Sequence, residues 1–311
     1  MTVWTQALSA DDQVAGPGWL YESPVWDHRR DRLVWVDIDL GQVHTLHPAS
    51  GEMAQHDLGR PVTAVALRRT GGYVLALERS LVACDEEFHL TAELAVPDDM
   101  AADVRFNDGA AAPDGSLWIG SLSHDRDGAG ALYRLPPAGA EAADLGRGTD
   151  VVMLSPVIEG VSISNGMDWS LDGRDHYYVD SGAGTVDVLH TGPTEGPSGW
   201  RVITRSPLAS FPSGTSPDGL TVDAEGGIWV ALWGGGRVVR LSRDGSITAE
   251  ITVPAPHVSS VAFGGAGLSD LYITTAREDL DAEALAAAPL SGSLFRCAAG
   301  VRGRPAFSWL G

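Results

Sequence analysis

Residues 218–231 read DGLTVDAEGGIWVA, and this stretch contains the pattern that decides the fold. Asp218 opens a short apolar run, a glycine stands eight residues after it, and Trp229 stands eleven residues after it. β-Branched and aromatic residues favour strands, whereas glycine favours the tight turns that join them. We therefore interpret the stretch as two antiparallel strands, the first of which opens with a polar residue.

The same pattern occurs elsewhere in the chain. Asn107 is followed by a glycine after eight residues and a tryptophan after eleven, and Asn165 by a glycine after eight and a tyrosine after twelve. Looser copies begin at Glu22, near Thr63 and near Ser259, which brings the number of copies to six. The aromatic-rich second strand of each copy is expected at residues 33–38, 73–77, 117–120, 177–180, 228–231 and 271–274.

Strand groups that recur every 40 to 60 residues are typical of a propeller. Dividing 311 residues among six units gives about 52 residues each, enough for four strands and their turns. Helical periodicity occurs only at residues 279–288. We therefore predict an all-β fold: a six-bladed β-propeller with four-stranded blades around a central metal-holding channel, formed by residues 1–311 as one domain. Residues 136–160 and 191–216, rich in Gly, Pro, Ser and Ala, are expected to be loops near the mouth of a site.

Composition excludes several classes of function. The formal net charge is −20, with 21 basic against 41 acidic residues, and no basic patch is visible. Nucleic acids and anionic membranes bind positive surfaces, so neither is expected as a partner. The first residues do not resemble a signal peptide, and no apolar run reaches the about 18 residues that span a bilayer, so we expect a cytoplasmic protein.

Cys84 and Cys297 are expected to be two buried thiols and not a disulfide. No feature of the sequence requires a protein partner.

The repeat also predicts a site. In a propeller the innermost strand of each blade lines the central channel, so Glu22, Asn107, Asn165 and Asp218 are expected in one ring. Buried carboxylates that face each other are costly unless a cation lies between them. Oxygen ligands favour Ca²⁺, Mg²⁺ or Mn²⁺, and less readily Zn²⁺ or Fe²⁺. Each residue alone is better explained by a turn before glycine, but the three matched copies together with Glu22 favour one divalent metal ion on Glu22, Asn165 and Asp218.

Several segments together resemble a known family, the senescence-marker protein (regucalcin), gluconolactonase and luciferin-regenerating enzyme group. The resemblance runs from about residue 22 to residue 277. It rests on ESPVW at 22–26, VTAVALR at 62–68, RFNDG at 105–109, ISNGMDWS at 163–170, PDG at 217–219 and GGRVVRL at 235–241. It implies a six-bladed propeller and a metal-dependent hydrolase of sugar lactones.

The resemblance also assigns residues. The Glu of ESP, the Asn of SNG and the Asp of PDG bind the metal in this family, which implies Glu22, Asn165 and Asp218. The RFNDG segment implies substrate contacts for Arg105 and Asn107. Acidic residues after the next strand hold sugar hydroxyls in some members, and the corresponding segment here, SHD at 123–125, offers Asp125.

The expected reaction is hydrolysis of an aldonolactone, such as gluconolactone or a pentonolactone, to the open aldonic acid. The metal would polarise the lactone carbonyl. Either Asp218 acts as general base or the water on the metal supplies hydroxide directly. Arg105 and Asn107 would orient substrate hydroxyls, although Arg105 has an alternative as an ion-pair partner and Asn107 as a direct ligand. Alternative functions are a metal-dependent phosphotriesterase or arylesterase on the same scaffold, and a non-catalytic calcium-binding propeller.

Overall fold

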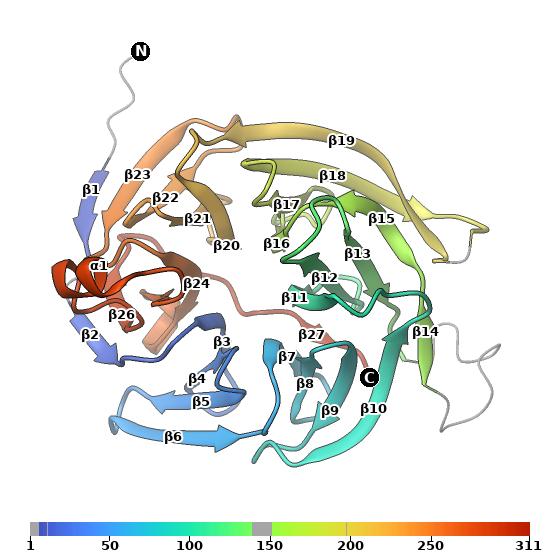
Figure 1. Cartoon of the computed structure of the whole chain (residues 1–311), viewed down its shortest axis with the longest axis horizontal. Helices are drawn as coiled ribbons and strands as arrows, with labels where there is room; N and C mark the ends of the chain where they lie inside the picture. Colours follow the sequence, from blue (N-terminus) through green and yellow to red (C-terminus); the bar gives the residue numbers. More distant parts are fainter. Residues whose placement is uncertain (1–5, 11, 139–150, 197) are drawn as a thin grey trace.

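A computed structural model describes residues 6–10, 12–138, 151–196 and 198–311. Within these residues the strands form six sheets, which are arranged around a common centre (Figure 1). Helix is confined there to α1 (Ala282–Ala287) and the 3-10 turn η1 (Ala266–Leu268). The predicted all-β propeller and the predicted short helix near residues 279–288 are therefore confirmed.

Three sheets each consist of four strands that lie side by side in the order in which they occur along the chain. The first contains β3 (Tyr21–Asp27), β4 (Arg32–Asp37), β5 (Gln42–His47) and β6 (Glu52–Asp57). The second contains β11 (Val104–Ala111), β12 (Leu117–Ser123), β13 (Gly130–Leu135) and β15 (Pro156–Val161). The third contains β16 (Ser164–Trp169), β17 (His176–Asp180), β18 (Thr185–Pro193) and β19 (Trp200–Ser210).

Two sheets are wider than the four strands expected. One contains β7 (Val62–Arg68), β8 (Tyr73–Leu77), β9 (Ser80–Cys84) and β10 (Leu90–Pro97), with β14 (Val152–Leu154) and β27 (Ser308–Trp309) at its two edges. The other contains β20 (Ser216–Val222), β21 (Ile228–Trp233), β22 (Arg237–Leu241) and β23 (Ile247–Thr252), with β1 (Gln6–Ser9) at its edge. These added strands come from distant parts of the chain, which a local repeat does not reveal.

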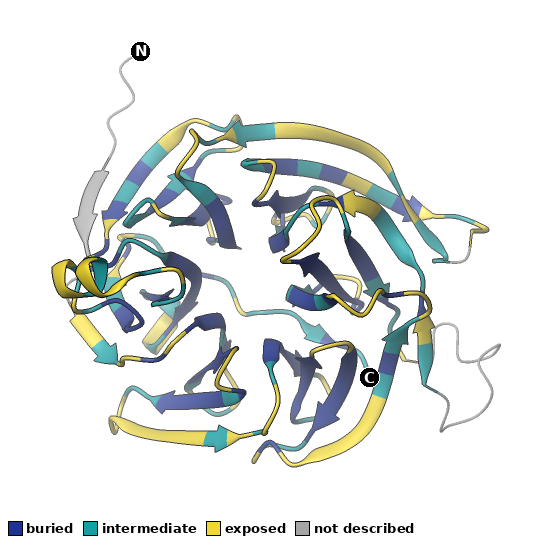
Figure 2. Cartoon of the chain, in the orientation of Figure 1, coloured by how far each residue is buried: buried dark blue, intermediate teal, exposed yellow. Residues whose placement is uncertain are grey.

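The remaining sheet combines one strand from near the beginning of the chain with three strands from its last quarter. It contains β24 (Val258–Gly264), β25 (Asp270–Thr275) and β26 (Leu294–Ala298), and its outermost strand is β2 (Asp12–Ala15). The innermost strands β3, β7, β11, β16, β20 and β24 each contact the next, and β24 contacts β3 in turn. Inner strands are largely buried, whereas the outer strand β6 is mostly exposed and β10 is exposed over its first half (Figure 2).

All six innermost strands begin at the same end of the channel, which we call the mouth, and finish at the far end. The hairpin after five of them contains a glycine, whereas the hairpin after β3 turns on Asp31, which has a φ angle of 49°. Gly115, Gly173 and Gly226 have φ angles of 82°, 71° and 87°, a region that glycine adopts without strain. The predicted turns of the repeat are therefore confirmed.

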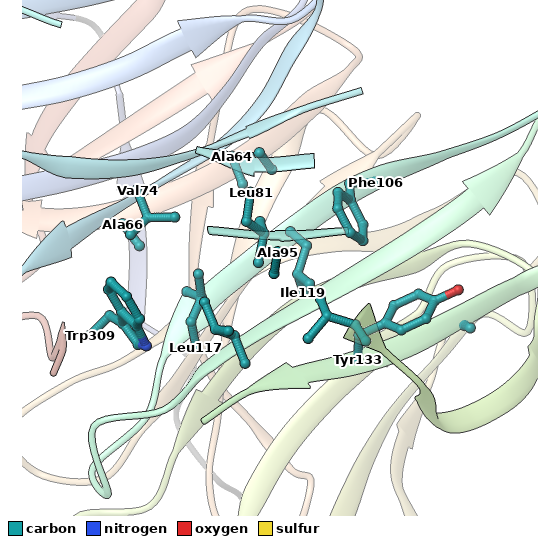
Figure 3. Packing of buried hydrophobic residues seen from close by; sticks show 14 of the residues in the cluster. Ala64, Ala66, Val74, Leu81, Ala95, Phe106, Leu117, Ile119, Tyr133 and Trp309 are labelled. Carbon is teal, nitrogen blue, oxygen red and sulfur yellow. The ribbon is translucent and has the colours of Figure 1, made fainter. Parts of the chain in front are cut away.

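Apolar side chains fill the space between neighbouring sheets. In the cluster of Figure 3, alanines and Val74 from β7 and β8 pack against Leu117 and Ile119 of β12. Trp309, from β27, packs into the same cluster. The C-terminal strand therefore contributes to a core that is built mainly from residues 64–154.

Two expectations from composition need correction. Residues 191–216 are not a loop, because β19 occupies residues 200–210 and pairs along its length with β18. Of residues 136–160, 139–150 lie outside the described residues, and β14 and most of β15 occupy the rest. Pro136 lies at the far end, where its carbonyl accepts a hydrogen bond from Trp309 Nε1 at 3.0 Å, and so it does not shape the mouth.

The two cysteines are free thiols, as expected, with Cys84 buried and Cys297 half-buried. In the part of the chain that the structure describes, no helix has the length and apolar character needed to cross a membrane.

Candidate active site

A break in strand register occurs near the beginning of every innermost strand. The pairing with the second strand shifts between Glu22 and Val25, Val62 and Ala64, Phe106 and Gly109, Ser164 and Met167, Pro217 and Leu220, and Val258 and Ser260. Such bulges redirect side chains and are common beside active sites. The polar residues singled out from the repeat lie at or inside these six bulges, which brings them together at the mouth of the channel.

The glycines of the SNG and PDG motifs have a packing role. A Cβ on Gly166 would lie 2.4 Å from the backbone oxygen of Asp218, and a Cβ on Gly219 would lie 2.0 Å from Ser260 Oγ. Side chains are therefore excluded where one innermost strand approaches the next. This close approach explains why a glycine follows each of the two candidate ligands.

Glu22, Asn165 and Asp218 are almost completely buried, with 8%, 6% and 5% of their surfaces exposed. Glu22 Oε2 accepts a hydrogen bond from the backbone N–H of Ser23 at 2.9 Å. Among the described residues, neither Asn165 Oδ1 nor Asp218 Oδ1 has a hydrogen-bond partner. Buried polar atoms are normally satisfied, so these oxygens indicate a site for a ligand.

Ser181 fixes the orientation of the Asn165 amide. Asn165 Nδ2 donates to Ser181 Oγ at 3.1 Å, and Ser181 Oγ donates to the carbonyl oxygen of Pro217 at 2.7 Å. The nitrogen of the amide is therefore engaged and its oxygen remains free. Sequence reasoning did not single out Ser181, which follows β17 and lies outside the repeated position.

The negative charge of each carboxylate in the site disfavours ionisation of the neighbouring carboxyl groups. Burial, followed by the charge of Asp108, raises the pKa of Glu22 to about 8. Burial, followed by the charges of Glu22 and Asp108, raises the pKa of Asp218 well above its ordinary value, and the Asn165 side chain opposes this shift. A divalent cation would relieve the repulsion by stabilising the charged forms.

Asp108 was missed by sequence reasoning, although it directly follows Asn107. The bulge in β11 places both residues out of the regular alternation, so that Asp108 also faces the channel. Burial raises its pKa to about 6. In the described part of the chain, no three or more His, Cys, Asp or Glu side chains are grouped to share a metal ion. The candidate metal set therefore depends on the amide oxygen of Asn165 beside two carboxylates, a donor set that fits a hard divalent cation.

Arg105 and Asn107 form a connected pair beside these oxygens. Asn107 Nδ2 donates to the carbonyl oxygen of Ser164 at 3.0 Å, and its Oδ1 accepts from Arg105 Nη1 at 3.0 Å. Arg105 Nη1 also donates to the carbonyl oxygen of Phe106 at 2.9 Å. Burial lowers the pKa of Arg105, whereas Glu278, Asp39 and Glu22 raise it.

The loops at the mouth add residues that the repeat does not contain. Glu278 follows β25 and is half-buried, and Asp39 follows β4 and is exposed. His257 Nδ1 lies 2.9 Å from the carbonyl oxygen of Glu278, and its ring stacks on Trp233 with centroids 4.2 Å apart. Asp125 lies on the exposed loop after β12 and is not among the buried channel residues.

Comparison with known proteins gives a consistent result. Residues 20–277 match the family described as SMP-30/Gluconolactonase/LRE-like region. Regucalcin from Gallus gallus is 33% identical over 300 residues, which cover 94% of this chain and 95% of that protein. A 6-deoxy-6-sulfogluconolactonase from Pseudomonas putida is 36% identical over 294 residues, which cover 93% and 94%.

Two solved structures superpose on this chain along nearly its whole length. A calcium-binding protein, regucalcin, from Agrobacterium tumefaciens superposes with a TM-score of 0.83 at 28% identity and covers 98% of this chain and 99% of its own. A luciferin-regenerating enzyme superposes with a TM-score of 0.81 at 27% identity and covers 96% and 98%. The match spans the segment in which the motifs were recognised. This chain therefore belongs to the SMP-30/gluconolactonase/LRE-like family.

Proposed function

We propose that this chain is a metal-dependent lactonase that hydrolyses a sugar lactone, such as gluconolactone or a pentonolactone, to the open aldonic acid. The observation that carries the proposal is the pair of buried, unpartnered oxygens, Asn165 Oδ1 and Asp218 Oδ1, beside Glu22. Relatives named for lactone hydrolysis, including the Pseudomonas putida sulfogluconolactonase, support the reaction class. Glu22, Asn165 and Asp218 would hold the cation.

Asp218 is the proposed general base. A cation bound by these three residues would polarise the lactone carbonyl and thereby stabilise the developing oxyanion. The oxygen of a water molecule attacks the carbonyl carbon while Asp218 accepts a proton from that water. The bond between the carbonyl carbon and the ring oxygen then breaks, and the ring oxygen takes up the proton.

Arg105 and Asn107 are proposed to orient the substrate. Arg105 is held by Phe106 and Asn107 on one side, which leaves part of its guanidinium available at the mouth. Fixed donors beside the ring position hydroxyl groups and reduce the entropy that must be lost in the reaction. Asn107 is engaged at both ends of its amide, and we propose that it acts on substrate mainly by holding Arg105.

The test removes the metal with a chelator, restores single cations, and follows acid release from a panel of aldonolactones. We expect turnover to disappear in chelator and to return with at least one divalent cation. Asn165→Leu, which removes an oxygen and keeps the side chain's size, should require a higher cation concentration for the same rate. Thr221→Val, on the same ring of strands but nearer the far end, is the matched control and should require the wild-type concentration.

Two results would contradict the proposal. Lactone turnover that persists after complete chelation would rule out the metal dependence. Turnover of aryl esters or phosphotriesters with none of any aldonolactone would replace the proposed substrate class.

A further inference from the structure

We infer that the mouth of the channel selects lactones without charge, and that Glu278 and Asp39 are the residues that reject a ring bearing a phosphate or sulfonate. The inference rests on the proposed function, because it concerns which lactones reach that site.

The register of the strands places three acidic loops at the mouth. Tyr21, at the start of β3, pairs with Asp37, so the loop that carries Asp39 lies at this end. Val258, at the start of β24, pairs with Thr275, so the loop that carries Glu278 and Asp279 lies there as well. The loop after β12 adds Asp125, because Val104 pairs with Ser123. A substituent that projects outward from a bound lactone meets these loops.

Arg105 offsets only part of this negative charge. Its guanidinium already donates to Phe106 and Asn107, and its Nη2 lies 3.4 Å from His124 Nε2. Glu278 and Asp39 lie near enough to Arg105 to be the leading charges acting on it. Arg126, on the same loop as Asp125, is paired with Asp103 at 2.7 Å. Among the described residues, Arg105 and Arg277 have no carboxylate partner, but the acidic side chains of the three loops outnumber these arginines.

An anionic substituent would therefore enter a partly desolvated region of excess negative charge. Charges of like sign repel more strongly where solvent is restricted, and salt screens the repulsion when they are exposed. A neutral hydroxyl at the same ring position meets no such barrier, and carboxylates accept hydrogen bonds from it. Discrimination should consequently depend on charge and on ionic strength more than on size.

The experiment compares two lactones that differ in one group, D-glucono-δ-lactone and its 6-phosphate, at neutral pH with subtraction of spontaneous hydrolysis. We expect kcat/KM of the phosphorylated lactone to be about 100-fold lower and to rise with added salt, while that of the neutral lactone changes little. Glu278→Gln and Asp39→Asn should each raise kcat/KM of the phosphorylated lactone by about tenfold. Glu52→Gln, an exposed carboxylate on β6 at the far end, is the matched control for net charge and should change neither lactone's kcat/KM.

A binding measurement separates this inference from the proposed function. 1,5-Anhydro-D-glucitol keeps the ring but has no ester, and it is compared with its 6-phosphate by calorimetry. Binding of the neutral ring with loss of the phosphorylated one supports the selection even if no lactone is hydrolysed. Equal or tighter binding of the phosphorylated ring, failure of either ring to bind, or the same gain in the Glu52→Gln control would overturn it.

Discussion

The two ends of the channel use the same six strands in opposite ways. At the mouth, buried oxygens of Asn165 and Asp218 are left without partners. Toward the far end, Asp168 of the same strand as Asn165 accepts from the backbone N–H groups of Trp169 and Val222, each at 2.8 Å, and pairs with Arg304. Unpaired buried oxygens cost stability and indicate a ligand, whereas saturated ones hold the fold together. The difference separates a functional end from a structural one.

The far end is closed by the C-terminal segment, residues 299–311, which crosses the centre of the ring toward β7 (Figure 1). Arg304 also donates to the carbonyl oxygen of Trp169 at 2.8 Å, and its guanidinium lies 4.5 Å from the centroid of the Phe307 ring. Leu310 N–H donates to the carbonyl oxygen of Gly115 at 2.9 Å. A cavity lies between the bulges and this segment, lined in part by Asp108, Asp168, Thr221, Arg304 and Phe307.

The difference between the two ends of the channel should be largest when Asp218 is changed. Asp218→Asn keeps the shape of the side chain and removes the proposed base, so we expect kcat for a lactone to fall by about 10²- to 10⁴-fold. The same change removes the repulsion with Glu22, so the melting temperature in chelator should stay the same or rise. Steady-state kinetics and thermal unfolding on one preparation check both effects. A variant that melts well below the wild type in chelator would show that Asp218 has a structural role instead.

The opposite result is expected at Asp168. Asp168→Asn leaves Arg304 largely buried without its carboxylate, and we expect the free energy of unfolding to fall by about 3 kcal/mol. Turnover per folded molecule should stay close to wild type, because Asp168 lies on the far side of the bulge. Urea unfolding measures the loss.

A double substitution separates the stability lost with the ion pair from the stability lost for other reasons. Asp168→Asn with Arg304→Met removes both charges and should recover part of the stability lost in the single variant. Strictly additive losses would show that the two side chains do not stabilise the fold through each other. Equal loss of lactone turnover in the Asp168 variant would remove the distinction between the two ends.

Most of the mouth could be predicted from sequence because its residues repeat. Asn107, Asn165 and Asp218 stand at the same distance before a turn glycine, and equivalent positions in a propeller converge on its axis. The less regular members Thr63 and Ser259 also lie in bulges. A bulge itself breaks the alternation of a strand, so its presence is not visible in the pattern.

The rest escaped prediction because it depends on contacts between distant segments. The pairing of Arg304 with Asp168 joins residues 136 positions apart, and neither belongs to the repeated spacing. Glu278 and Asp39 lie on hairpin loops whose lengths differ from sheet to sheet, so no periodicity identifies them. β19 was missed for a different reason, since its Pro- and Ser-containing sequence is typical of loops.

The smallest expected effect concerns protons at the mouth. In the chain without cation, burial and Asp108 hold the pKa of Glu22 at about 8, so cation binding below that pH must release a proton. Each proton released contributes about tenfold per pH unit, so affinity for Ca²⁺ should rise by at least that much between pH 6 and pH 8, as measured by calorimetry. Asp168→Asn, at the far end, is the control and should keep this slope. An affinity independent of pH in this range would contradict the assignment of Glu22 as a ligand.

Without cation, the free energy of unfolding should change with pH in the opposite direction to the affinity for Ca²⁺. The folded chain keeps a proton on Glu22 up to about pH 8, whereas the unfolded chain loses it near the ordinary value of 4.5. The folded state thus binds more protons in this window, so the free energy of unfolding in chelator should fall as pH rises through it. A saturating divalent cation favours the deprotonated carboxylate and should abolish Glu22's contribution to that fall. Urea unfolding at pH 6 and pH 8, in chelator and in Ca²⁺, measures how much of this pH dependence the cation removes. A pH dependence that came from groups at the far end would be the same in chelator and in Ca²⁺.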